Sequence, residues 1–329
     1  MTNQTRREFL STTAGLLSFA IVEPVLGLDK KKPLLAFSTL GCPKWTFAQI
    51  VKCAAENGYQ GIEIRGIMGE LDLPKCPEFS AENMAVTRHL LEKNRLKIVD
   101  LGSSAKMHFA DAIKRKANLD DAKRFIDLAQ KLDCPNIRVF PDDLPKDQKD
   151  DETVDWIIKN LVELGEYARG SSVNILLESH GKVVHSDMLY KIMHSTEHPN
   201  VGLVWDFFNM WSVTKESPKN VYRKLKKYIK HVHVKDAKLV NGKEEYTLLG
   251  EGEAPVAEAL TVLKQDGFKG YYSFEWEKMW HPEIQEPEIA IPHYAKEIQK
   301  YWKRCYEFLP LAFRQFFKLE NHTMNYFLR

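Results

Sequence analysis

The sequence predicts a closed (β/α)₈ barrel, an α/β fold, from three observations. Eight short, almost wholly apolar runs recur after residue 33, and a stretch with helical periodicity follows each one. Runs of this kind are typical of parallel strands buried on both faces. The eight units occupy about 275 residues, close to the roughly 250 that are typical of such barrels. An open doubly wound sheet is the competing prediction, but no GxGxxG motif follows the first run.

The predicted strands and helices alternate along the whole of this region. The strands are LLAFSTLG (34–41), GIEIRG (61–66), LKIVDLGSS (96–104), NIRVFPDD (136–143), VNILLESH (173–180), VGLVWDF (201–207), HVHVKDA (231–237) and YYSFEWE (271–277). The helices are expected at 46–57, 82–94, 118–132, 152–169, 186–195, 217–228, 255–266 and near 286–308. Asn57-Gly58 and Asp266-Gly267 are typical helix ends.

Composition narrows the function class. Of the 329 residues 44% are hydrophobic and 28% charged, so a sizeable core is expected and disorder is not. Lys and Arg number 47 and Asp and Glu 45, a formal net charge of +2. Such a chain lacks the global field that steers nucleic acid or an anionic membrane. The expected partner is a small neutral or weakly charged molecule, with no nucleic acid, and homo-oligomerisation is left open.

The cysteines indicate neither a disulfide framework nor a structural zinc site. They are odd in number, widely spaced and without a CxxC pair. We expect mostly buried thiols at Cys42, Cys53, Cys76, Cys134 and Cys305.

The N-terminus resembles a twin-arginine (Tat) export signal. Arg6-Arg7 precedes an uncharged stretch, Ser11 to Val22, and small residues near Gly27 offer a cleavage point. The stretch is shorter than the about 20 residues of a spanning helix, so no stable membrane insertion is expected. We therefore expect a signal at 1–27, a barrel at 28–308, an unassigned tail at 309–329 and a periplasmic location. The alternative is a frayed amphipathic start on a cytoplasmic protein.

Polar side chains lie at the C-terminal ends of the last four predicted strands. Because side chains alternate along a strand, Glu178, Asp206, His233 and Glu275 are expected to point into the barrel. Active sites of such barrels lie at that end. Three carboxylates and an imidazole would repel unless a cation lay among them, which predicts a divalent metal: Mn²⁺, Co²⁺ or Mg²⁺, with Zn²⁺ as a further candidate. The alternatives are a helix N-cap at Asp206 and surface carboxylates.

Other residues are candidates for contacting a substrate. Glu63 and Arg65 share a face of the second strand and could form an ion pair, and His180 lies two residues past Glu178. Lys235 could bind an oxyanion, although pairing with Asp236 or Glu277 is favoured. Aromatic faces near a rim often stack on a bound ligand, which favours Trp280 over the helix-facing Trp276. His231 is expected to form hydrogen bonds inside the barrel, and residues 248–253 to form a flexible loop, a candidate lid.

These motifs resemble a known family. LLESH, VWDFFN, HVHVKD and SFEWE, with the early GYQGIEIRG, are similar to the sugar phosphate isomerase/epimerase group of the xylose isomerase-like TIM barrels over residues 33–300. The resemblance implies that Glu178, Asp206, His233 and Glu275 hold the metal and that Glu178 and Glu275 move the proton. Two positions depart from the ketose 3-epimerase pattern: Asn209 stands where a substrate-contacting histidine is expected, and Leu239 where an arginine is expected. These departures leave the substrate open.

The resemblance implies an enzyme of carbohydrate metabolism. A metal that polarises a sugar carbonyl stabilises the enediolate formed when a neighbouring C–H proton is lost, which supports isomerisation or epimerisation. An exported enzyme would meet non-phosphorylated or oxo sugars rather than sugar phosphates. The alternatives are a lyase or dehydratase using the same site, and a non-catalytic exported carbohydrate-binding barrel. A metal-dependent DNA endonuclease is disfavoured by the near-neutral charge.

Overall fold

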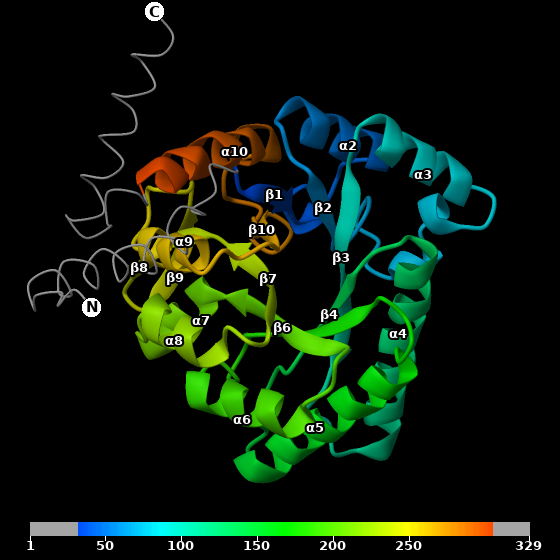
Figure 1. Ribbon diagram of the computed structural model, residues 1–329, viewed down its shortest axis with the longest axis vertical. Helices are drawn as coiled ribbons and strands as arrows, with labels where there is room; N and C mark the ends of the chain where they lie inside the picture. The colour runs from blue at the N-terminus through cyan, green and yellow to red at the C-terminus, as the bar shows by residue number, and fades with distance from the viewer. Residues whose placement is uncertain (1–31, 305–329) are drawn as a thin grey trace, which may run out of the picture.

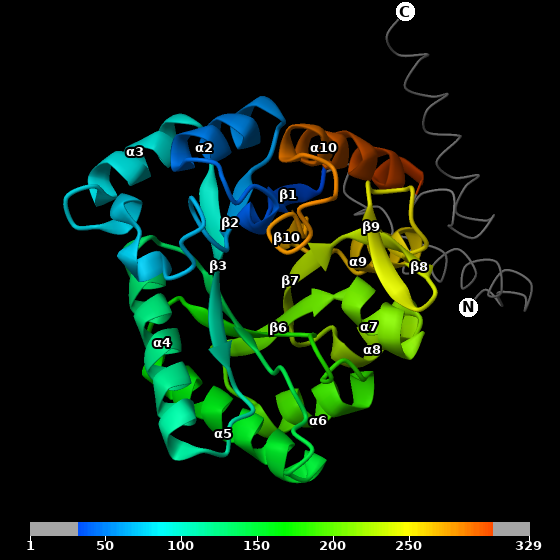
Figure 2. The same ribbon diagram turned by 180° about the vertical axis from the view of Figure 1, so that it is seen from behind.

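The computed structural model describes residues 32–304 and confirms the predicted barrel. Eight parallel strands form one sheet in the order β1-β10-β7-β6-β5-β4-β3-β2, and a ring of helices surrounds it (Figures 1 and 2). A single parallel bridge between Ser38 and Glu63 joins the two edge strands, so the barrel is nearly closed. The predicted signal at 1–27 and tail at 309–329 lie outside the described residues. Within residues 32–304, no helix is long and apolar enough to cross a membrane.

All eight predicted strands are present, most of them shorter than expected. The barrel strands are β1 (Leu34–Phe37), β2 (Gly61–Ile64), β3 (Lys97–Lys106), β4 (Asn136–Phe140), β5 (Asn174–Glu178), β6 (Val201–Asp206), β7 (Ile229–Val234) and β10 (Tyr271–Phe274). The polar residues that end most of the predicted runs lie just past the strands, in the loops at the mouth of the barrel. Loops at that end build the active sites of such barrels.

The helices also agree with the prediction to within a few residues, except that α4 begins at Ala112 rather than at residue 118. The predicted ones are α2 (Phe47–Glu56), α3 (Met84–Lys93), α4 (Ala112–Lys131), α5 (Asp150–Tyr167), α6 (Ser186–Thr196), α8 (Pro218–Leu225), α9 (Val256–Gln265) and α10 (Pro287–Arg304). Short 3₁₀ turns add η1 (Thr39–Gly41), η2 (Leu73–Lys75) and η3 (Pro77–Phe79).

One helix and one β-hairpin were not predicted. Helix α7 (Phe207–Thr214) follows β6 directly, and an antiparallel hairpin of β8 (Asp236–Val240) and β9 (Lys243–Thr247) follows β7. The hairpin is not apparent from the sequence because its strands carry charged residues. Only buried elements produce the apolar periodicity on which the prediction depends. Both elements lie beside strand ends that carry the predicted metal ligands.

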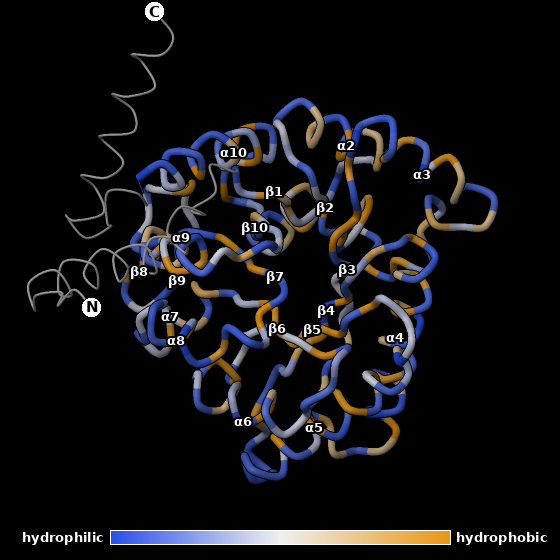
Figure 3. Tube along the Cα trace, in the orientation of Figure 1, coloured by the Kyte–Doolittle hydropathy of each residue, from blue (hydrophilic) through white to orange (hydrophobic). Residues whose placement is uncertain are grey.

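The core lies between the strands and the surrounding helices. Figure 3 shows hydrophobic segments along the strands and alternating hydrophilic and hydrophobic stretches along the helices. The predicted outward residues of the last strand pack on α10: the rings of Phe274 and Tyr294 lie 4.6 Å apart, and Trp276 is fully buried. Packing on the helices therefore uses one face of each strand, and the other face points into the barrel, where apolar residues such as Leu176 and Val204 lie beside the polar ones.

The cysteine prediction holds for the described residues. Cys42, Cys53, Cys76 and Cys134 are free, and all but Cys53 are buried. Burial raises the pKa of the Cys42 and Cys134 thiols well above the usual value, so neither is a reactive thiolate.

Candidate metal centre

The structure brings the four predicted ligands together inside the barrel. Glu178 ends β5, Asp206 ends β6, His233 lies near the end of β7, and Glu275 directly follows β10. One ligand atom from each lies within 4.8 Å of all the others, and all four side chains are buried. Neighbouring strands aim them at one point because the predicted inward parity is correct at each position.

His233 lies at the centre of this cluster, which we call the metal centre. Its Nδ1 is 3.2 Å from Glu275 Oε1, 3.3 Å from Glu178 Oε1 and 3.9 Å from Asp206 Oδ2. Nδ1 and Asp206 Oδ2 are buried without a hydrogen bond of good geometry among the described residues. Asp206 Oδ2 is paired with Lys235 Nζ, 2.9 Å away, whereas His233 Nδ1 has only carboxylate oxygens around it. Buried polar atoms are almost always satisfied, so Nδ1 indicates room for a further partner at this point.

The titration behaviour shows how negative this centre is. Burial alone would lower the pKa of His233, but Glu275, Glu63 and Glu178 raise it well above its ordinary value. Burial, together with Glu275 and Glu178, raises the pKa of Asp206 to about 7, against the opposing effect of Lys235. A group of charges that favours protonation this strongly would favour a bound cation for the same reason.

Asp206 forms the helix N-cap that the sequence offered as an alternative to metal ligation, and its second oxygen stays available for the metal. Its Oδ1 accepts a hydrogen bond from the Asn209 backbone N–H, 2.8 Å away, and so caps α7. Its Oδ2 turns toward the metal centre. A carboxylate has two oxygens, so capping and ligation do not compete, and the cap fixes the direction of the free oxygen.

The residues present fit a divalent metal ion. Three carboxylates and one imidazole form a mostly oxygen donor set, which suits Mn²⁺, Mg²⁺ or Co²⁺ and admits Zn²⁺. Nδ1 of His233 is free to act as a ligand because Nε2 lies 3.0 Å from Glu63 Oε2, to which it would donate. A carboxylate behind a metal-binding histidine commonly fixes its tautomer in this way.

Glu63 lies inside the barrel, as predicted, but its partners differ from the predicted one. Its side chain is 1% exposed, and its Oε2 lies 2.9 Å from His231 Nε2 and accepts from Ser273 Oγ at 2.8 Å, in addition to the contact with His233. The predicted ion pair with Arg65 is wrong: among the described residues, no carboxylate pairs with Arg65. Glu63 therefore contacts His233 on the side of Nε2, and its contact with a substrate stays a prediction. The expected hydrogen-bonding role of His231 is confirmed.

Lys235 pairs with Glu277, as the sequence favoured, and also with two residues of the metal centre. Its Nζ lies 2.9 Å from Glu277 Oε1, 2.7 Å from Glu275 Oε2 and 2.9 Å from Asp206 Oδ2. Asp236, the other predicted partner, instead accepts hydrogen bonds from backbone N–H groups. Lys235 is thus a buried cation that holds two of the four ligands from behind.

Arg138 is a residue beside the metal centre that the sequence prediction missed. It lies on β4 and places Nε 3.1 Å from Glu178 Oε2, and both side chains are buried. The signal was present: Arg138 is a charged residue inside the predicted strand NIRVFPDD. The prediction rests on polar residues at the ends of strands, whereas Arg138 lies in the middle of its strand.

Three predicted substrate contacts lie in less buried surroundings. His180 is 39% exposed and its Nδ1 lies 3.1 Å from Asp142 Oδ1. The side-chain amide of Asn209 donates to the Ser179 carbonyl at 3.2 Å, and Trp280 is 51% exposed. Contact between these residues and a substrate stays a prediction.

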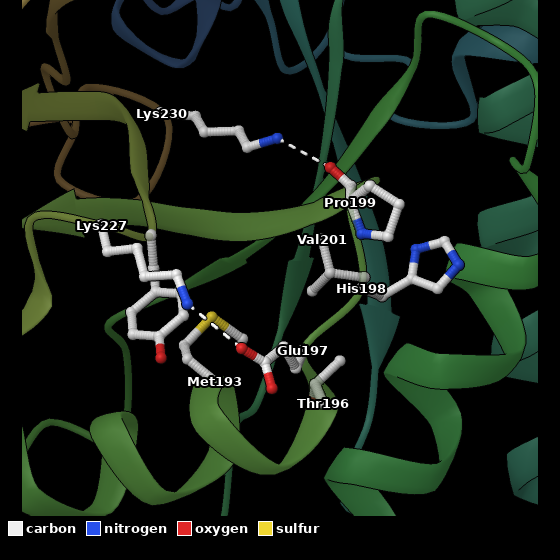
Figure 4. Close-up of a pocket in the computed structure, with 9 residues that line it drawn as sticks. Met193, Thr196, Glu197, His198, Pro199, Val201, Lys227 and Lys230 are labelled. Atoms are coloured by element: carbon white, nitrogen blue, oxygen red, sulfur yellow. Dashed lines mark hydrogen bonds and ion pairs between the residues drawn. The ribbon is translucent and has the colours of Figure 1, made fainter.

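A pocket at another part of the molecule is unrelated to this chemistry. Figure 4 shows it between the C-terminus of α6 and the starts of β6 and β7. Its two lysines are already engaged, Lys227 with Glu197 and Lys230 with the Pro199 carbonyl. Active sites of (β/α)₈ barrels lie at the opposite ends of the strands, where the metal centre is.

Comparisons with known proteins agree with this fold. Fructoselysine 3-epimerase of Shigella flexneri is 22% identical over 263 residues, which cover 76% of this chain and 91% of that protein. A D-tagatose 3-epimerase-like protein superposes with a TM-score of 0.66 at 21% identity, covering 83% of this chain and 98% of that one. A protein from Mycobacterium smegmatis in complex with magnesium gives 0.64 at 18% identity, covering 83% and 97%.

The match to a family model extends through most of the barrel. It covers residues 51–305, which include β2 to β10 and all four residues of the metal centre. The chain belongs to the xylose isomerase-like TIM barrel family.

Proposed function

We propose that this chain is a divalent-metal-dependent sugar isomerase or epimerase that removes a proton next to a carbonyl. The observation that carries the proposal is the convergence of Glu178, Asp206, His233 and Glu275 at the C-terminal ends of adjacent strands. The similarity to two 3-epimerase-type proteins supports the sugar class. The proposed substrate is a sugar without a phosphate, or an oxo sugar.

Two glutamates are placed to move the proton. The Oε1 atoms of Glu178 and Glu275 both approach His233, while each Oε2 is held by a buried cation, Arg138 for Glu178 and Lys235 for Glu275. These cations and His233 outweigh burial and lower the pKa of both carboxyls. Both glutamates are therefore ionised at neutral pH, as a base must be.

The direction of proton return would decide the reaction. A bound dication supplies polarisation of the substrate carbonyl and stabilises the negative charge that develops on it. If one glutamate takes the proton and the other delivers one to the opposite face, the carbon is inverted. If the proton returns to the adjacent carbon, aldose and ketose interconvert.

The test is deuterium uptake measured by NMR. Free, phosphorylated and 3-oxo sugars are incubated in D₂O with the Mn²⁺-loaded protein. We expect incorporation beside the carbonyl of one sugar class, at a rate reduced about 10²- to 10⁴-fold by Glu178→Gln or Glu275→Gln and abolished by chelation of the metal. The exposed Glu56→Gln is the matched control. Full exchange in both site variants rejects their role, elimination of a substituent indicates a lyase, and binding without exchange indicates a carbohydrate-binding barrel.

We also propose that residues 1–27 direct export to the periplasm, on the basis of Arg6-Arg7 and the short apolar stretch that follows. Cell fractionation tests this: the chain should reach the periplasm, and Arg6→Lys combined with Arg7→Lys should retain it in the cytoplasm. Equal distribution of both forms would refute the export proposal.

A further inference from the structure

Arg65 and Arg138 are the two buried arginines of residues 32–304, with exposed fractions of 5% and 2%. Their surroundings differ. Arg138 pairs with Glu178, whereas no carboxylate among the described residues lies within 4.0 Å of the Arg65 guanidinium. Arg65 donates only to neutral oxygens, the Gly102 carbonyl at 3.4 Å and Ser104 Oγ at 2.9 Å. A buried charge without a counter-charge is costly, and proteins rarely keep one without a use.

The second arginine makes this cost larger. Arg65 and Arg138 approach each other over Gly102: a Cβ added there would lie 2.8 Å from Arg65 Cδ and 3.1 Å from Arg138 Nη2. Burial and the charge of Arg138 lower the pKa of Arg65 to about 10, even though Glu178, Glu275 and Glu63 act in the opposite direction. An anion beside Arg65 would remove this imbalance.

The position of Arg65 suits a substrate group. Its Nη2 donates to Ser104, a residue that is exposed near the end of β3, so this end of the guanidinium lies toward solvent. Arg138, which approaches Arg65 over Gly102, contacts Glu178, a residue of the metal centre. A molecule could therefore reach Arg65 from the mouth of the barrel and extend toward the metal centre.

We infer that Arg65, together with Ser104, forms a subsite for an anionic group of the substrate, a carboxylate or a phosphate ester on the carbon chain away from the reacting carbonyl. The guanidinium presents paired N–H donors that match such oxygens, and the Ser104 hydroxyl adds a third donor. One guanidinium balances one charge, so the carboxylate of a sugar acid is the favoured source. The inference rests on the proposed function, because it names the substrate class of the same centre.

The test uses three ligands that differ only at C6: D-fructose, D-fructuronate and D-fructose 6-phosphate. Their dissociation constants are measured by NMR titration against the full chain loaded with Mg²⁺. We expect wild-type protein to bind fructuronate about 10- to 100-fold more tightly than fructose, as a charged hydrogen-bonded pair should. Arg65→Met should abolish this preference and leave fructose binding unchanged. The exposed Arg223→Met is the control and should keep the preference.

The phosphate arm distinguishes the sources of the anion. A stronger preference for fructose 6-phosphate, also lost in Arg65→Met, supports the subsite and assigns it to a phosphate ester. Equal binding of all three ligands by wild-type protein, or an anion preference that survives Arg65→Met, overturns the inference.

Stability separates this role from a structural one. If the function of Arg65 is to bind an anionic ligand, the melting temperature of Arg65→Met should equal or exceed that of the wild type, because the substitution removes an unpaired buried charge. If Arg65 is structural, the melting temperature falls and the inference fails. Ser104→Ala keeps the guanidinium and should weaken fructuronate binding a few-fold. Anion preference without deuterium exchange would refute only the proposed function, whereas exchange without preference would refute only the subsite.

Discussion

At the scale of single residues, Glu63 determines how His233 is presented. Its Oε2 accepts from Ser273 and contacts both histidines of β7, whereas in Glu63→Gln a neutral amide takes its place. The Nε2 proton of His233 would then lose its charged acceptor, and Nδ1 would be oriented less firmly. We expect the affinity for Mn²⁺ to fall about 10- to 100-fold, measured by electron paramagnetic resonance titration of free Mn²⁺.

The exposed Glu56→Gln is the control for this prediction and should bind Mn²⁺ like the wild type. Nitrogen-15 chemical shifts of the His233 ring provide a second readout, because they report which nitrogen carries the proton. Unchanged shifts and unchanged affinity in Glu63→Gln would contradict the positioning role.

His180 and Asp142 form a second pair whose titration can be measured. Burial opposes the charge on His180, but the hydrogen bond to Asp142 and the charge of Glu178 raise its pKa above the ordinary value. A raised histidine pKa means that the stabilisation is complete below the unfolded pKa of about 6.5 and is lost as pH rises through the folded value. We expect Asp142→Asn to lower the His180 pKa, as followed by NMR titration.

The exposed Asp143→Asn is the neighbouring control, since Asp143 pairs with Lys182 instead of His180. The prediction fails if the two substitutions shift the His180 pKa equally.

At the scale of elements, one carboxylate fixes the loop that the sequence suggested as a flexible lid. Asp236, at the start of β8, accepts hydrogen bonds from the N–H groups of Gly250 and Gly252 through Oδ2 and from Ala254 through Oδ1. An added Cβ at Gly252 would lie 2.1 Å from Asp236 Oδ1, so only glycine permits this close approach. The segment is thus anchored beside the hairpin.

Replacing Asp236 should free this segment. In Asp236→Ala four backbone N–H groups lose their acceptor, those of Gly250, Gly252 and Ala254 and that of the adjacent Ala237. This should cost about 2 to 4 kcal/mol of unfolding free energy. Hydrogen exchange at Gly250, Gly252 and Ala254 should speed up at least about ten-fold, whereas the exposed Glu245→Ala should change neither quantity. Unchanged exchange in Asp236→Ala would mean that the loop is held by other contacts.

At the scale of the whole molecule, β1 and β2 close the barrel without a regular ladder of hydrogen bonds, although Leu35 and Gln60 also bond to each other. The edge strands β1 and β2 share the single bridge at Ser38 and Glu63, and the Thr39 side chain reinforces it. Thr39 Oγ1 donates to the Gly66 carbonyl at 2.7 Å and accepts from the N–H groups of Arg65 and Gly66. This hydroxyl therefore joins the first and second units of the barrel.

Thr39→Val preserves shape but removes all three hydrogen bonds. We expect the free energy of unfolding to fall by about 2 to 4 kcal/mol, which is measured as a lower urea midpoint of unfolding. Thr87→Val is the matched control, because Thr87 is also buried but its hydroxyl makes one hydrogen bond, to the Glu78 carbonyl. Equal midpoints for the two variants would show that the closing contacts contribute little.

Much of the candidate site was predictable because it depends on strand parity. Two-residue alternation and the position of strand ends are local properties, and together they placed Glu178, Asp206, His233 and Glu275 inside the barrel. The eight strands and their helices were equally predictable, since burial on both faces leaves continuous apolar runs. The hairpin and α7 carry no such periodic signal.

The fold class, the order of the elements and the four residues that converge can all be predicted from the sequence. The partners of the other charges depend on the three-dimensional arrangement: Glu63 beside His233, Lys235 between Asp206 and Glu275, Arg138 on Glu178, and Arg65 with no carboxylate among residues 32–304. This difference arises because burial and parity are set within each strand. Ion pairs across the barrel depend instead on the relative heights of different strands, which no local pattern encodes.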